Sequence, residues 1–196
     1  DAGSAYVFVR SGSTWTEQDK LVAADGMMGD GFGVSVGIDG STIVVGASLD
    51  DDGAVLNIGS AYVFVSGISD WTQQDKLVAN DAAVGDQMGY SVAISGDTII
   101  AGAFGNDDDG GNSGSAYAFV RSGTSWSEQR KFTASDAAKA DHFGWSVAIS
   151  GERVVIGAFR DDDHGEDSGS AYVFVREGTK WLQDEKLTAE DIFDDS

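Results

Sequence analysis

The residues best suited to chemistry in this chain are aspartates that gather in short runs. Three runs recur along the sequence: Asp50-Asp51-Asp52-Gly53, Asp107-Asp108-Asp109-Gly110, and Asp161-Asp162-Asp163-His164-Gly165-Glu166-Asp167. Hard divalent cations take oxygen ligands from carboxylates and backbone carbonyls, often at alternate loop positions. This spacing makes calcium the candidate ion, with these candidate ligands: Asp50, Asp52, Asp107, Asp109, Asp161, Asp163, Gly165 through its carbonyl, and Asp167. No run completes a D-x-D-x-D-G loop with a distal acid, so solvated acidic loops are the alternative interpretation.

A second set of acids precedes each unit of the sequence, as pairs five residues apart: Asp25 and Asp30, Asp81 and Asp86, Asp136 and Asp141. In total 33 acidic residues face 12 basic ones, which gives a formal net charge of −21. Such a charge repels phosphate backbones and anionic lipid, so we expect neither nucleic acid nor direct membrane insertion. Solubility alone is the simpler explanation of the acidity.

Other patterns that could indicate catalysis are weak. There is no cysteine, so a thiolate nucleophile and a thiolate metal site are excluded. Gly33-Val-Ser-Val-Gly37 fits a G-x-S-x-G elbow, but it opens a strand pattern, so we interpret Ser35 as structural. His142 and His164 each occur once at otherwise repeated positions. We therefore expect no catalytic residues and no enzyme activity.

The element that positions the acids is the heptapeptide Gly-Ser-Ala-Tyr-Val-Phe-Val, which is repeated along the chain. Its copies, one with Ala118 in place of the first valine, span 3–9, 59–65, 114–120 and 169–175, at spacings of 56, 55 and 55 residues. A period of this size indicates an array of similar units.

One repeat contains four strand-like segments. They are Gly89–Ile94, Thr98–Ala103, Gly114–Val120 and Trp126–Phe132. Glycine turns separate them, since the chain has 27 glycines and no proline, and no helical periodicity of useful length appears. The prediction is an all-β fold, a β-propeller of four-stranded antiparallel blades, with a stack of β-sandwiches as the runner-up.

The strand order also predicts where the acids lie. In an antiparallel meander the second-to-third and the fourth-to-first connections emerge on the same side, so both acidic sets should share one face. The opposite face should carry the glycine hairpins and these basic residues: Arg10, Arg121, Arg153, Arg176 and Lys180.

Two short motifs give a resemblance to a known family. A Phe-Gly or near match opens each repeat, at 32–33, 88–89 and 143–144, and a Gly-Ala ends the second strand, at 46–47, 102–103 and 157–158. The chain resembles the FG-GAP repeats of integrin α-subunit propellers and many secreted proteins, although the motif's proline is absent. The resemblance implies a ring, commonly of seven blades, an adhesive use, and calcium in a long loop between the first two strands. Here that connection has only four residues, too few to wrap a calcium ion.

The blade count is incomplete for a closed ring. We expect a half blade over 1–24, blades over about 25–80, 81–135 and 136–190, and a truncated tail at 191–196, which makes about three and a half blades. Propellers usually close with about 4–8 blades. Further blades, self-association with other copies, or a four-bladed ring with one defective blade are the alternatives.

These observations lead to three functional hypotheses. The first is a non-enzymatic extracellular or cell-surface recognition or adhesion module that binds a protein or glycan ligand at the acidic face, with calcium as the candidate cofactor. The second is a structural assembly unit, the protomer of a fibre or sheath. The third is an accessory domain of a larger secreted enzyme.

Overall fold

The computed structural model describes residues 1–68, 70–163 and 165–189, and the predicted tail at 191–196 lies outside them. These residues form fourteen strands and no helix, so no helix crosses a membrane within them. The strands are β1 (Ala5–Ser11), β2 (Thr14–Leu21), β3 (Phe32–Asp39), β4 (Thr42–Ala47), β5 (Ser60–Ser66), β6 (Trp71–Leu77), β7 (Ser91–Ser95), β8 (Thr98–Ala103), β9 (Ser115–Ser122), β10 (Ser125–Phe132), β11 (Phe143–Ser150), β12 (Arg153–Ala158), β13 (Ser170–Glu177) and β14 (Lys180–Thr188). The strands predicted for the repeat at 88–133 are confirmed within two residues.

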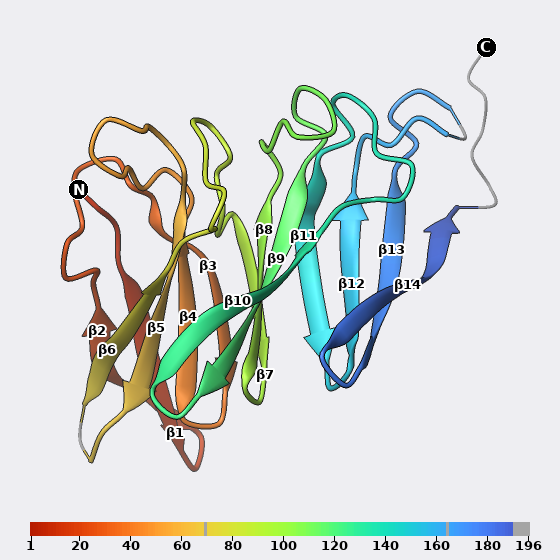
Figure 1. The fold of residues 1–196 in the computed structure, drawn as a ribbon. Helices are drawn as coiled ribbons and strands as arrows, with labels where there is room; N and C mark the ends of the chain where they lie inside the picture. Colours follow the sequence, from red (N-terminus) through yellow and green to blue (C-terminus); the bar gives the residue numbers. More distant parts are fainter. Residues whose placement is uncertain (69, 164, 190–196) are drawn as a thin grey trace.

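The strands pair in chain order into four antiparallel sheets that stand side by side (Figure 1). We call β1–β2 the half-blade, β3–β6 blade A, β7–β10 blade B and β11–β14 blade C. Each third-to-fourth pairing contains a register shift, for example between Val63 and Phe64. The arrangement is a partial β-propeller of about three and a half blades, as the sequence predicted.

The core lies between neighbouring sheets, and every interface repeats one pattern. A large apolar residue at the end of one sheet's last strand packs against the tyrosine and phenylalanine of the next sheet's third strand. The sets are Leu21 with Tyr62 and Phe64, Leu77 with Tyr117 and Phe119, and Phe132 with Tyr172 and Phe174. Burying one such side chain stabilises a fold by about 1.5–3 kcal/mol, so these contacts make each blade depend on its neighbour.

The Phe-Gly and Gly-Ala motifs explain how closely the blades approach. A Cβ on Gly46 would lie 1.8 Å from the carbonyl oxygen of Gly89 in the next blade, and a Cβ on Gly102 would lie 1.9 Å from that of Gly144. Only glycine fits such a contact. Ser35 adds a polar link, because its Oγ accepts a hydrogen bond from the amide of Val92 at 3.0 Å. The serine of the G-x-S-x-G pattern thus links blade A to blade B.

Candidate functional site

The acidic connections emerge on one side of the molecule, as the strand order predicted. The second-to-third and fourth-to-first loops lie at the upper end of the sheets in Figure 1, and the tight hairpins lie at the lower end. At the lower end two of the predicted basic residues have acidic partners: Arg121 lies 2.7 Å from Asp97, and Arg176 lies 3.7 Å from Glu152. We call the upper end the acidic face.

A tyrosine and a lysine in each complete blade bind the acids of this face. In blade A the hydroxyl of Tyr62 donates to Asp25 at 2.9 Å, and Lys76 Nζ lies 2.7 Å from Asp25 and 2.8 Å from Asp50. The tyrosine comes from the repeated heptapeptide and the lysine from the strand beside it, at positions that face each other in the register. We call this arrangement the lysine clip. It joins the loop that enters a blade to the body of that blade.

The clip in blade C contains the largest number of carboxylates. Lys186 Nζ lies 2.7 Å from Asp136, 3.0 Å from Asp161 and 2.5 Å from Asp163. The hydroxyl oxygen of Tyr172 lies 2.8 Å from Asp136 and 2.7 Å from Asp161, so its single proton is shared between the two carboxylates. In blade B, Lys131 binds Asp81 and Asp108, while Asn106 takes the place of Asp161 and accepts a hydrogen bond from Ser115.

The pKa values in the clips reflect these contacts. Burial of Asp161 opposes its ionisation, but hydrogen bonds from Tyr172, Lys186 and Ser170 outweigh burial and hold its pKa below the usual range. Burial also opposes the ionisation of Asp136, but the hydrogen bonds from Lys186 and Tyr172 outweigh it and lower the pKa of Asp136. Burial raises the pKa of Tyr172, and its carboxylate partners raise it further. The clip therefore keeps its carboxylates ionised and its phenol neutral.

The acid that follows the buried residue closes the loop in every complete blade. Asp51, Asp107 and Asp162 accept a backbone hydrogen bond from Asn57, Asn112 and Asp167 at 2.7, 2.6 and 2.8 Å, respectively, which closes the loop. The structural equivalents of Asp50 and Asp52 in blade B are thus Asn106 and Asp108, one residue before the predicted pair Asp107 and Asp109. The predicted residues of blade B are displaced by one position because the equivalent of Asp50 is an asparagine, Asn106.

The predicted calcium ligands are only partly brought together. Asp161 and Asp163 lie in one group with Asp136, and one carboxylate oxygen from each of the three lies within 4.8 Å of the other two. The carbonyl of Gly165 instead accepts a hydrogen bond from Ser168, and Asp167 lies 3.9 Å from Arg160. In blade A, Asp50 is buried on Ser60, Tyr62 and Lys76, while Asp52 is exposed.

The group around Asp161 does not fit a calcium ion as it stands. An ammonium already lies among its three carboxylates, and calcium prefers six to eight oxygen ligands. A divalent ion would have to displace Lys186. The sequence did not identify Asp136 or Lys186 as members of this group. The pattern that could have identified them is the constant spacing of the leading aspartate, the tyrosine and the lysine in every repeat.

The second acid of each leading pair is a buried turn residue. The carboxylates of Asp30, Asp86 and Asp141 accept hydrogen bonds from the amides three residues earlier, at 2.5, 2.9 and 2.7 Å. Burial raises the pKa of Asp86 and Asp141. These acids therefore shape the loops rather than present charge to a ligand.

An aromatic cluster lies at the start of the inner strands of blades B and C, next to the acidic loops. Trp145 packs against Tyr90 at 4.6 Å, Phe104 at 4.8 Å and Phe159 at 4.4 Å between ring centroids. His142 stacks on Trp145, and burial lowers its pKa. Blade A has no such cluster, because Val34 and Ser48 occupy the matching positions. In the sequence, this cluster is visible as a change from Val34 and Ser48 in blade A to aromatic residues at the same positions of blades B and C. His164, the other histidine of the chain, lies outside the described residues.

Solved structures with a similar fold share little sequence identity with this chain, and the similarity covers only part of each of them. The crystal structure of Saccharomyces cerevisiae Sqt1 matches with a TM-score of 0.51 and 9% identity, over 82% of this chain and 36% of that one. A europium-containing methanol dehydrogenase matches with a TM-score of 0.47 and 8% identity, over 77% of this chain and 23% of that one. This chain therefore spans well under half the length of either. At such identity the likeness to Sqt1 concerns the fold alone.

The family model provides the sequence-level match. No curated protein matches the chain. The model described as FG-GAP repeat matches three times, over residues 15–64, 71–119 and 126–174, which together make up more than half of the sequence. Each match ends within the tyrosine- and phenylalanine-bearing third strand of a complete blade and covers its Phe-Gly and Gly-Ala motifs. The chain belongs to the FG-GAP repeat family.

Proposed function

We propose that the protein is a non-enzymatic recognition or adhesion module that acts outside the cell or at its surface and binds its partner on the acidic face. One observation carries the proposal: acidic loops of all three complete blades share a face with a cluster of aromatic side chains. FG-GAP repeats are typical of extracellular proteins, which supports the location. Loops held on a rigid scaffold are common sites of recognition.

The chemistry of the face suits a protein or a glycan ligand. Net charge of −21 attracts basic protein segments, and the electron-rich faces of aromatic rings attract cations. Phe159 is partly exposed and already carries Arg160 over its ring at 5.3 Å. A glycan would use the same rings for stacking and the exposed carboxylates for hydrogen bonds. The charge favours the basic protein segment, and a neutral glycan is the other outcome of the test.

The test is a titration with basic peptides and with a panel of neutral glycans, followed by tryptophan fluorescence and calorimetry. Binding should weaken at least about tenfold in Phe159→Ala, and added salt should weaken it only if the ligand is basic. Trp15→Ala is the matched control, because Trp15 is an exposed aromatic residue of the half-blade. Equal binding by both variants would place recognition elsewhere.

Calcium enters the proposal as a competitor of Lys186. The ion would bind Asp136, Asp161 and Asp163 only after it had displaced the ammonium from them. We therefore expect weak binding, with a Kd on the order of 10⁻⁴–10⁻³ M, the range of extracellular calcium modules. The ligand in this scheme binds independently of calcium.

A second candidate function, a structural assembly unit, is favoured by the exposed apolar side chains of the half-blade. Tyr6, Phe8 and Trp15 lie at the surface, although their counterparts in blades B and C are buried. Other copies or further blades that pack there would extend the array. Sedimentation of the protein over a range of concentrations tests this: growth of the species supports assembly, and a constant 20.4 kDa monomer contradicts self-assembly.

A further inference from the structure

The loop between β4 and β5 in blade A is apolar where the equivalent loops of blades B and C are not. Each of the three loops closes on a residue with a positive φ whose amide is bound by the loop-closing acid: Asn57, Asn112 and Asp167. Counting back from these residues places Val55 and Leu56 at positions that are glycines in blade B, at 110–111. In blade C the same positions are Gly165 and Glu166. Val55 and Leu56 are both exposed, so the core of the blade does not require their apolar character.

The loop that enters blade B adds a third apolar side chain. It runs beside Leu56, because the amide of Gly85 donates to the carbonyl of Leu56 at 3.1 Å. Val84 directly precedes this contact and is 65% exposed. At the equivalent junction of blades B and C, Lys139 stands in the place of Val84 and Gly111 in the place of Leu56. The junction of blades A and B therefore carries an exposed apolar patch, which we define as Val55, Leu56 and Val84.

A carboxylate beside the patch lacks the cation that its equivalents have. The backbone of Asp52 pairs with that of Val55 in both directions, at 3.1 and 3.0 Å, which holds this acid next to the patch. In blades B and C the lysine of the clip also binds the equivalent acid, and the pairs are Lys131 with Asp108 and Lys186 with Asp163. Lys76 of blade A contacts other acids, and the exposed Asp52 has no salt-bridge partner within residues 1–68, 70–163 and 165–189.

The patch and the acid together define the chemistry of a partner. Exposed apolar side chains with a polar rim are typical of contacts between proteins. An anionic lipid surface would be repelled by the net charge of −21. A neutral apolar partner would cover Asp52 without neutralising it, which is costly for a carboxylate. A segment that carries apolar side chains beside a lysine or an arginine satisfies both features.

We propose that the apolar patch and Asp52 form a docking surface for a basic amphipathic segment of a partner protein. Apolar side chains of the segment pack on Val55, Leu56 and Val84, and its lysine or arginine binds Asp52. The surface lies over blades A and B, at the upper end of the sheets in Figure 1, and does not include the aromatic cluster of blades B and C. The proposal rests on the recognition function of the acidic face and names the chemistry of its partner.

The probe is a peptide of leucine and lysine in which the leucines recur at helical spacing along one face. A peptide of the same composition in scrambled order is its control, since the charge is equal but the leucines no longer share a face. Calorimetry with the full chain should show saturable one-to-one binding of the patterned peptide. Binding of the scrambled peptide should be at least about tenfold weaker, because apolar anchors must meet the patch together.

Two substitutions in the patch use residues that blade C already has at the same positions, so the variants should fold. Val84→Lys copies Lys139 and should weaken binding of the patterned peptide at least about tenfold, since it removes apolar area and repels the lysines. Leu56→Glu copies Glu166 and separates the two contributions. Binding by charge alone would become stronger with the added acid, whereas loss of the apolar contact should weaken it about fivefold or more.

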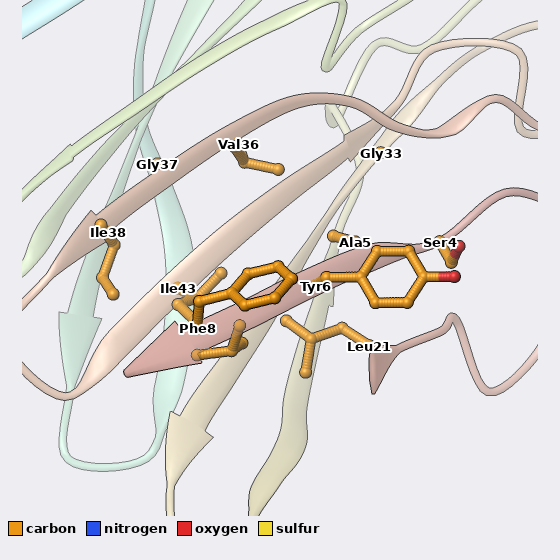
Figure 2. A pocket seen from close by; sticks show the side chains of 11 residues that line it. Ser4, Ala5, Tyr6, Phe8, Leu21, Gly33, Val36, Gly37, Ile38 and Ile43 are labelled. Carbon is orange, nitrogen blue, oxygen red and sulfur yellow. The ribbon is translucent and has the colours of Figure 1, made fainter. Parts of the chain in front are cut away.

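Val36→Lys is the matched control for Val84→Lys. Val36 is 58% exposed and also belongs to blade A, but it lines a separate apolar hollow of about 360 Å³ between β1 and β3 (Figure 2). The same change of valine to lysine there should alter the affinity less than about twofold, as expected for a charge outside the contact. Melting followed by circular dichroism checks that both variants are folded.

The unpaired acid has its own test. Asp52→Asn should weaken binding about twofold to fivefold and reduce the effect of added salt. Asp108→Asn is the control, because Lys131 already neutralises Asp108 in blade B, and it should leave the affinity unchanged. Equal losses in both variants would mean that the peptide responds to total charge and would contradict the role of Asp52.

Three results would overturn the proposal: equal binding of the scrambled peptide, stronger binding by Leu56→Glu, or unchanged affinity of Val84→Lys. Self-association that Val84→Lys abolishes would also overturn it, since a second copy would then be the occupant. Phe159→Ala separates the patch from the aromatic site. A loss in Val84→Lys alone supports the patch and contradicts recognition at the aromatic cluster, whereas a loss in Phe159→Ala alone contradicts the patch and leaves the proposed function intact.

Discussion

The heptapeptide Gly-Ser-Ala-Tyr-Val-Phe-Val occurs unchanged at 3–9 and 59–65, and the two copies have opposite environments. Tyr62 and Phe64 are 0% and 3% exposed, whereas Tyr6 and Phe8 are both 50% exposed. β5 has a strand on each edge and the half-blade against its aromatic rings, while β1 pairs only with β2 within residues 1–68, 70–163 and 165–189. The neighbours of this strand decide whether it is core or surface.

The lysines of the last strands show the same contrast. Lys186 binds three carboxylates in blade C, while Lys20 of the half-blade is exposed and lies over the ring of Tyr6 at 5.6 Å. The acids that complete a clip come from the loop that enters the blade. A recurrent residue therefore has a recurrent role only where the whole unit is present.

The largest effect should separate the two phenylalanines. Phe64→Ala removes a buried ring between the half-blade and blade A and should lower the free energy of unfolding by about 3–5 kcal/mol. Phe8→Ala removes a half-exposed ring and should cost less than about 1 kcal/mol. Urea unfolding measures both, and equal losses would mean that the half-blade is as well packed as blade A.

The next effect should separate the two lysines. Lys186→Met leaves the buried carboxylate of Asp161 without its cation and should cost about 1–3 kcal/mol. Lys20→Met should stay within about 0.5 kcal/mol of the wild type, as most surface substitutions do. If Lys20→Met lost as much free energy of unfolding as Lys186→Met, Lys20 would have to make an interaction as stabilising as the contacts of Lys186.

Acid should reduce the difference between wild type and Lys186→Met. The lowered pKa values of Asp136 and Asp161 contribute stability that is complete above the ordinary carboxyl pKa of about 3.9 and is lost as the pH falls through the folded-state values. Asp141 acts with the opposite sign, because burial raises its pKa and protonation relieves its cost. Urea unfolding at several pH values checks this, with Lys20→Met as the pH-independent control. If the difference in unfolding free energy between wild type and Lys186→Met stayed constant down to pH about 2, the ionised carboxylates would not be its cause.

The smallest effect concerns calcium. In the wild type, calcium should raise the melting temperature only slightly, whereas in Lys186→Met it should bind the three freed carboxylates and recover part of the lost stability. At 100 times the Kd, one native-state ion adds about 2.7 kcal/mol. Lys131→Met is the control, since Asn106 removes one carboxylate from its clip. A strong calcium response of the wild type, absent with magnesium, would instead support the original ligand prediction.

The fold could be predicted from the sequence because every local signal recurs with the same period. Glycine turns, alternating strands and the Phe-Gly and Gly-Ala motifs all indicated one four-stranded unit, and strand parity placed the acidic loops on one face. These signals are local and repeated, so each copy supports the others.

The site was less predictable because its contacts are not local. Asp136 and Lys186 are 50 residues apart, and the sequence alone does not show that this lysine neutralises the loop acids. The aspartate runs also looked interchangeable, yet the run in blade B begins one structural position later, because Asn106 stands where blades A and C have a buried aspartate. Only side-chain geometry separates a buried acid from a loop-closing or an exposed one.

Hydrogen exchange of the amides of β1 and β5 tests the central contrast most directly. It should be measured at concentrations where sedimentation gives a single 20.4 kDa species. Amides of alternate residues point to opposite edges of a strand. We expect slow exchange along the whole of β5, and fast exchange of those β1 amides that point away from β2. Equal protection of both strands in the monomer would contradict the account, because β1 would then have a covered edge.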